Sequence, residues 1–83
     1  MPYINKPARL RIEDDLEEID IQNSGELNYV LTSIIREYLV NHGKSYATYN
    51  EVVGVLECCK LELYRRLVAP HEDKKCEENG DVY

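Results

Sequence analysis

The segment at residues 48–69 constrains the fold most, because its apolar residues fall on more than one side of a helix. One stripe recurs every three or four positions and consists of Val52, Leu56, Cys59, Leu63 and Leu67. Other apolar side chains fall beside or opposite this stripe: Val53, Leu61, Tyr64 and Val68. A single neighbouring helix cannot cover both sides. We therefore expect this helix to lie at the centre of its own domain or to be shared with another chain.

The ends of this helix are marked in the sequence. Thr48 and Glu51 have the spacing of a capping box, in which each side chain accepts from a free backbone amide of the first turn. Ala69-Pro70 predicts that the helix ends or kinks, and residues 70–83 are expected to form a polar extension with one or two further helical turns. Gly54 costs about 1 kcal/mol relative to alanine in a helix, so we expect another backbone to approach closely there.

Two further helices precede this segment. Apolar residues at spacings of three and four predict a helix at 25–42, with Ser24 as its N-cap and Gly43 beyond its end. A shorter acidic helix is predicted at 9–20, after a lead-in at 1–8. Its apolar seam is narrow, and opposite charges are expected to be neighbours four positions apart on its surface, in the pairs Arg9 with Glu13 and Arg11 with Asp15.

These patterns predict an all-α fold: one small three-helix domain over residues 1–83, with a C-terminal helical extension broken by proline. A chain of 83 residues leaves much of its apolar surface poorly covered unless it packs tightly or self-associates. We therefore expect a homo-oligomer that is held together through the second and third helices.

The charge of the chain limits its partners. Sixteen acidic and ten basic residues give a net charge of −6, which repels duplex nucleic acid. No run approaches the roughly 20 apolar residues of a membrane span, and the N-terminus has no apolar signal segment. We expect a cytoplasmic protein that has neither duplex nucleic acid nor a membrane as a partner.

The reactive side chains do not form a recognisable catalytic or metal motif. Three cysteines, two of them adjacent, argue against a disulfide framework, and Cys58, Cys59, Cys76 and His71 lack the spacing of a zinc site. Neither histidine belongs to a nucleophile motif, and no glycine-rich phosphate loop is present. We expect no metal, no cofactor and no enzymatic activity.

The tyrosines and arginines suggest a ligand site instead. All seven aromatic residues are tyrosines, which suit half-wet interfaces and pockets. In Tyr64-Arg65-Arg66, two guanidiniums stand beside a ring, so they can grip a phosphate while a base stacks on the ring. Tyr46, Tyr49 and Asn50, at the other end of the same helix, can meet them only across a subunit boundary. The ordinary alternative is that Tyr64 belongs to a core and that the arginines pair with Glu62 or the acidic tail.

Acidic residues of the first helix and the tail offer a second interpretation. Carboxylates including Glu13, Glu17 and Glu18 can replace phosphates on a basic host protein, although a solvated helix face is the commoner reason for such a run. The tail, with Asp81 and Tyr83, either frays or docks into a groove on a partner or on its own oligomer, and we expect it to dock.

The sequence also resembles a family of small phage and bacterial proteins along almost its whole length. The resemblance is carried by Met1-Pro2-Tyr3-Ile4, by Gly25-Glu26-Leu27-Asn28-Tyr29-Val30, by Asn50-Glu51-Val52-Val53-Gly54-Val55-Leu56-Glu57-Cys58 and by Glu78-Asn79-Gly80-Asp81-Val82-Tyr83. No activity is established for that family. The resemblance implies a phage setting, and with it the host cytoplasm, and implies that the tail is held in place.

Two functional hypotheses follow. In the first, a helical oligomer sequesters an anionic, nucleotide-like molecule between subunits, and Arg66→Ala abolishes binding without dissolving the oligomer. In the second, an acidic surface binds and modulates a host protein, and charge reversal at Glu17 and Glu18 releases it. In a third hypothesis, the helix at 48–69 only builds an oligomer and binds no ligand.

Overall fold

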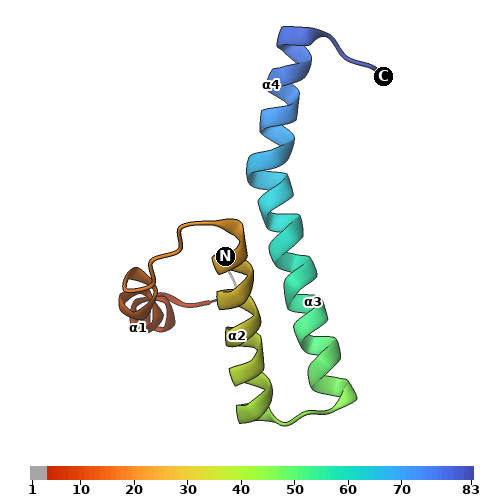
Figure 1. The fold of residues 1–83 in the computed structure, drawn as a ribbon. Coiled ribbons are helices and arrows are strands. Elements are labelled where there is room, and N and C mark those ends of the chain that lie inside the picture. Colours follow the sequence, from red (N-terminus) through yellow and green to blue (C-terminus); the bar gives the residue numbers. More distant parts are fainter. Residues whose placement is uncertain (1–3) are drawn as a thin grey trace. The chain divides into compact units, whose positions relative to one another are not determined.

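The computed structural model describes residues 4–83, which are folded into helices joined by short connections (Figure 1). The elements in chain order are α1 at Lys6–Glu17, α2 at Ser24–His42, α3 at Tyr46–Leu63, the π-helical turn η1 at Tyr64–Val68, and α4 at Ala69–Asn79. The last three form one joined helix, because no loop separates them. The predicted all-α fold of three helices is therefore confirmed, and residues 4–83 contain no strand.

The chain divides into two compact units, Met1–Ile34 and Ile35–Tyr83. The first contains α1 and the beginning of α2, and the second contains the end of α2 together with α3, η1 and α4. The assignment of the whole chain to one domain stays a prediction.

Helix α1 begins at Lys6, three residues earlier than predicted, and ends at Glu17 rather than at residue 20. The cause is Asn5, whose side-chain oxygen accepts from the Ala8 amide at 3.0 Å and so caps the first turn. Pro7 lies in that first turn, where its missing N–H has no partner in any helix.

The charge pairs predicted on α1 do not form. Within residues 4–83, no ion pair joins Arg9 to Glu13 or Arg11 to Asp15. Every side chain of α1 except Ala8 is exposed, so little of this helix is held by packing.

Helix α2 is capped by Asn23, and the prediction that Ser24 is the N-cap was wrong. The Asn23 side-chain oxygen accepts from the Glu26 amide at 2.9 Å, and its amide group donates to the Glu26 carboxylate at 2.6 Å. Asparagine caps as well as serine does, and Glu26 is three residues from Asn23 but only two from Ser24. The helix ends at His42, and Gly43 follows with a left-handed φ of 94°, which confirms the predicted stop.

Helix α3 is capped by Ser45 rather than by Thr48. The Ser45 hydroxyl accepts from the Thr48 amide at 3.3 Å, and the Thr48 hydroxyl accepts from the Ser45 amide at 3.0 Å. Thr48 is therefore the third helical residue of a capping box, and the helix starts at Tyr46. Glu51, the predicted partner of Thr48, is free to bond elsewhere.

The predicted end or kink at Pro70 is replaced by a π turn. Pro70 has no N–H for the carbonyl of Arg66, and its ring would clash with that carbonyl in an ordinary α-helix. The Ala69 amide donates instead to the carbonyl of Tyr64, five residues back, so the turn is wider by one residue. The helix then continues as α4 for 11 residues, further than the expected one or two turns, and stops before Gly80 at φ 87°.

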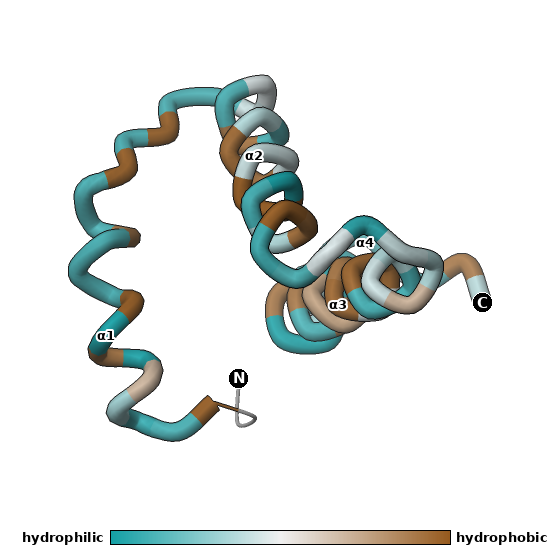
Figure 2. The backbone as a smooth tube through the Cα atoms, turned by 90° about the horizontal axis from the view of Figure 1, so that it is seen from below, coloured by the Kyte–Doolittle hydropathy of each residue, from teal (hydrophilic) through white to brown (hydrophobic). Residues whose placement is uncertain are grey.

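Packing within one chain is sparse. No side chain of residues 4–83 is buried, and ten are half-buried: Ala8, Val30, Ser33, Ile35, Leu39, Thr48, Val52, Glu62, Val68 and Ala69. Hydrophobic positions recur along the helices (Figure 2), yet large apolar side chains such as Val53 and Leu67 are each 65% exposed. The apolar surface of α3 is thus left uncovered on more than one side, as its sequence pattern suggested.

No other part of residues 4–83 packs against Gly54. A Cβ added at Gly54 would find no atom within 4 Å. The close backbone approach that we expected at this glycine is therefore not supplied by the chain itself.

None of the helices within residues 4–83 is both long enough and apolar enough to cross a bilayer.

The capping assignments can be tested by substitution. We expect Asn23→Ala to lower the free energy of unfolding by about 1 kcal/mol, because two groups at the helix end lose their partner. Its neighbour provides a matched control: Ser24→Ala removes a hydroxyl from the first helical residue and should change the stability by less than about 0.5 kcal/mol. Urea denaturation followed by circular dichroism measures both. A larger loss for Ser24→Ala would contradict the assignment.

Candidate functional site

The predicted site at Tyr64, Arg65 and Arg66 coincides with the π turn η1. Tyr64 is 50% exposed, and its hydroxyl donates to the Glu72 carboxylate at 3.1 Å. It is therefore not a core residue, which removes one half of the ordinary alternative. Its ring is held in place by a hydrogen bond to the first turn of α4 and remains accessible to solvent.

The two arginines differ in their partners. Arg66 Nε lies 3.1 Å from Glu62 Oε1, four residues earlier, so for Arg66 the alternative interpretation is correct. The Arg66 side chain is 59% exposed, and a pair this open to solvent contributes at most about 1 kcal/mol. Within residues 4–83, no acidic group lies within 4.0 Å of the Arg65 guanidinium. Neither arginine pairs with the tail in that part of the chain.

The other predicted ligand residues lie at the N-terminal end of α3. Tyr46 is 80% exposed and Tyr49 47% exposed, and Asn50 is exposed beside them. At 1.5 Å per residue, Asn50 and Arg65 are separated by about 20 Å along the helix. The structure does not bring the two groups together within one chain.

A cluster that the sequence reasoning missed joins the end of α2 to the start of α3. The Tyr38 hydroxyl donates to Glu51 Oε2 at 3.2 Å. The rings of Tyr38 and His42 are stacked, with centroids 4.1 Å apart and planes inclined by 17°. His42 Nδ1 also lies 3.0 Å from the Tyr38 carbonyl oxygen. The spacing of four residues between Tyr38 and His42 was a visible signal for the stack, but nothing local pointed to Glu51.

Carboxylates alter the acidity of both bonded tyrosines. The hydrogen bond to Glu51, and then the charge of that carboxylate, raise the pKa of Tyr38 above its ordinary value of 10.0. Glu72 raises the pKa of Tyr64 in the same way. A phenolate would lose the hydrogen bond and be repelled by the carboxylate, so both rings remain neutral donors at physiological pH.

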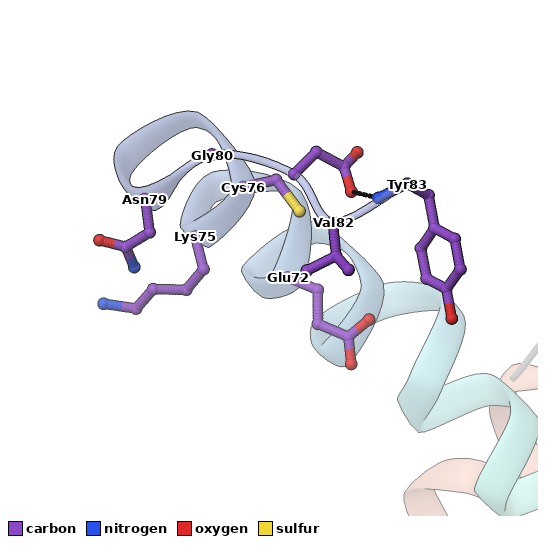
Figure 3. A pocket seen from close by; sticks show the side chains of 8 residues that line it. Glu72, Lys75, Cys76, Asn79, Gly80, Val82 and Tyr83 are labelled. Carbon is purple, nitrogen blue, oxygen red and sulfur yellow. Dashed lines mark hydrogen bonds between the residues drawn. The ribbon is translucent and has the colours of Figure 1, made fainter.

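An open hollow of about 420 Å³ lies where the tail leaves α4 (Figure 3). Its lining consists of Glu72, Lys75, Cys76, Asn79, Gly80, Asp81, Val82 and Tyr83. The Asp81 carboxylate accepts from the Tyr83 amide at 3.0 Å, which gives the tail a local bend. Val82 is 93% exposed, so the tail is not docked against its own chain, and docking on another molecule stays a prediction.

The remaining predicted residues lie on or next to α1. Glu13 and Glu17 belong to the helix and Glu18 is its C-cap; all three are exposed, and none forms an ion pair within residues 4–83. The three cysteines are exposed free thiols. In the described part of the chain, no group of three histidine, cysteine, aspartate or glutamate side chains is placed to hold a metal ion.

The effect of Glu51 and Glu72 on the tyrosines gives a prediction for alkaline pH. In each case the folded-state pKa is raised above the unfolded value, so the hydrogen bond stabilises the fold fully below about pH 10 and is lost as the pH rises through the raised pKa. We expect two tyrosines to ionise later than the others. Glu51→Gln and Glu72→Gln should each move one of them back, whereas Glu57→Gln should not. Tyrosinate absorbance measures this, and identical titration curves for all four proteins would contradict it.

Comparison with known proteins places the chain in a family. No curated protein and no solved structure is significantly similar to it. A family model described as "Domain of unknown function (DUF6899)" matches residues 1–82. This match agrees with the resemblance to a family without an established activity. The chain belongs to that family, whose model spans almost all of its length.

Proposed function

We propose that this protein is a non-enzymatic binding protein, which holds an anionic, nucleotide-like small molecule at η1 in a self-associated assembly. One observation carries the proposal: the structure leaves Arg65 without an acidic partner within residues 4–83, directly beside the exposed ring of Tyr64. A cation and a flat ring are thus available together at one turn.

The chemistry of this turn suits a phosphate that is attached to a base. A guanidinium presents paired N–H groups to two phosphate oxygens, and an exposed ring offers a face for stacking. Because Glu72 already holds the Tyr64 hydroxyl, less side-chain freedom is lost when a base stacks on that ring. Arg66 can exchange its weak, exposed bond to Glu62 for a second phosphate contact.

The acidic surroundings favour a small ligand over a polymer. The chain has a net charge of −6, and Glu62 and Glu72 are bonded to residues of η1 itself. A long polyanion would be repelled by the rest of the surface, whereas a small anion contacts only the local guanidiniums. This supports a ligand of one or two nucleotide units.

Self-association supports the proposal from a second direction. The chain leaves the apolar side chains of α3 in water, and it leaves Tyr46, Tyr49 and Asn50 about 20 Å from the arginines. A second copy of the chain would cover the apolar side chains of α3 and bring its own Tyr46, Tyr49 and Asn50 near the arginines. We propose binding without catalysis because the groups at η1 are guanidiniums, a phenol and carboxylates that are already bonded.

Calorimetry with adenosine monophosphate tests the site, and native mass spectrometry of the purified protein looks for a co-purified anion. We expect Arg65→Ala to weaken binding at least about tenfold, because a charge-assisted contact is lost. Arg65→Lys should recover part of it, because lysine keeps the charge but not the paired N–H groups.

Lys74→Ala is the matched control for charge, since it removes one cation from α4 outside η1. Adenosine and inorganic phosphate should each bind more weakly than the nucleotide, because each lacks one of the two contacts. Equal affinities of the Arg65→Ala and Lys74→Ala variants would refute the assignment of the site.

The second candidate function is binding to a basic protein surface through α1. It is favoured by the exposed carboxylates of Glu13, Glu17 and Glu18, which have no ion-pair partner within residues 4–83. We expect Glu17→Lys with Glu18→Lys to release a host protein held in this way, and Arg65→Ala to leave it bound. Retention of the partner by the doubly reversed variant, in a pull-down at low salt, would exclude this function.

A further inference from the structure

One face of α3 is turned away from the contact with α2. Glu51 bonds to Tyr38, and Thr48 and Val52 beside it are half-buried, so they mark the covered side. Because successive residues of an α-helix are turned by 100°, the opposite side is defined by residues that recur every three or four positions. We name this side the outer face; it consists of Tyr46, Asn50, Val53, Glu57, Leu61 and Tyr64, with Lys60 at its edge.

The outer face is apolar at both ends and charged in the middle. Val53 is 65% exposed on one side of the centre, and Leu61 and Tyr64 are 55% and 50% exposed on the other. In the middle, Lys60 Nζ lies 3.0 Å from Glu57 Oε1, and both side chains are more than half exposed. At the edge of the face, Gly54 has no atom within 4 Å of an added Cβ, so a neighbouring helix meets no side chain there.

The order of Glu57 and Lys60 along the helix distinguishes a parallel from an antiparallel arrangement of two copies. If two copies lay parallel, Glu57 would face Glu57 and Lys60 would face Lys60. About a two-fold axis between these positions, an antiparallel copy places each Glu57 opposite the Lys60 of the partner, and Val53 opposite Tyr64. We propose that the outer face pairs with the same face of a second copy, antiparallel, with the axis between Glu57 and Lys60.

This pairing brings partner residues to the Arg65 side of the ligand site proposed at η1. About that axis, Tyr49 and Asn50 of the partner subunit lie at the level of Val68 and Leu67, within the turn that carries Arg65. Arg66 lies about 200° round the helix from Tyr64, on the side of its partner Glu62 and away from the pair. The partner's Tyr46 follows one helical turn further on. The Tyr49–Asn50 group and Arg65, which one chain holds about 20 Å apart, are thus brought to the same level along the two helices, once at each end of the pair. The inference deepens the proposed function and rests on it for the role of these contacts, but the pairing itself needs no ligand.

Exchange of the central charges tests the pairing. In sedimentation velocity without ligand, we expect Glu57→Lys and Lys60→Glu each to weaken self-association at least about tenfold, because like charges then face each other. An equimolar mixture of the two variants should associate again as a mixed pair. That recovery cannot come from the bond within one chain, since each variant lacks it.

The matched control is Lys75→Glu, which breaks a bond of the same spacing, at 3.4 Å to Glu78, outside the outer face. It should leave association unchanged. Circular dichroism of each variant shows whether the helix itself is retained.

The direction of the two copies can be measured through a native cysteine. In a Cys58→Ser, Cys59→Ser variant, a spin label on Cys76 should lie about 50 Å from its counterpart in the antiparallel pair, at 1.5 Å per residue from the axis. In a parallel pair the labels would be within roughly 20 Å, because packed helices are about 10 Å apart.

The outcomes separate this inference from the proposed function. A monomeric wild type, a short distance between the labels, or a mixture that fails to associate overturns the pairing, while nucleotide binding at Arg65 is measured independently. If antiparallel pairs form but bind no nucleotide, the pairing is confirmed and the proposed nucleotide ligand is refuted.

Discussion

The structure depends on polar contacts at helix ends, because hydrophobic burial within one chain is slight. No side chain of residues 4–83 is buried. The starts of the helices are therefore set by hydrogen bonds that free amides of the first turn donate to the side-chain oxygens of Asn5, Asn23 and Ser45. The bond from Tyr38 to Glu51 then ties the end of α2 to the start of α3. This bond leaves one side of α3 covered and the opposite side free, and that free side carries the self-complementary pattern of the outer face.

Pro70 links the local chemistry of the chain to the candidate site. Because Pro70 lacks an N–H, the helix widens into a π turn at Tyr64–Val68. The hydroxyl of Tyr64 donates to Glu72 across this turn, while Arg65 keeps no acidic partner within residues 4–83. A proline that predicted the end of a helix in fact shapes the turn that carries the proposed ligand residues. Only Arg66 has a carboxylate four residues away, in Glu62; the residue four before Arg65 is Leu61.

The limits of sequence reasoning are visible at the caps. Asn23 and Ser24 are adjacent and cap almost equally well, so type alone could not choose between them. Ser45 and Thr48 are likewise both good N-caps. Glu51, three residues after Thr48, has the capping-box spacing and therefore favoured the wrong prediction of Thr48. The structure decides the matter: Gly43 turns the chain with φ 94°, and Ser45, whose backbone is extended, caps α3. The charge pairs predicted on α1 failed for a different reason: exposed pairs gain too little to fix two long side chains.

By itself, the sequence determined the helical class, the number of helices and the end of the second helix before Gly43. These features depend on residues within one or two turns of each other, so apolar spacing and backbone preference were sufficient. It also identified Tyr64, Arg65 and Arg66 as neighbours, since they are consecutive. Only the tertiary structure decided that Glu51 bonds to Tyr38, and hence which side of α3 is covered. That contact depends on how the chain returns after α2, which no local pattern specifies. Because one side is thereby covered, the opposite side is the one that we propose as a surface for a second copy.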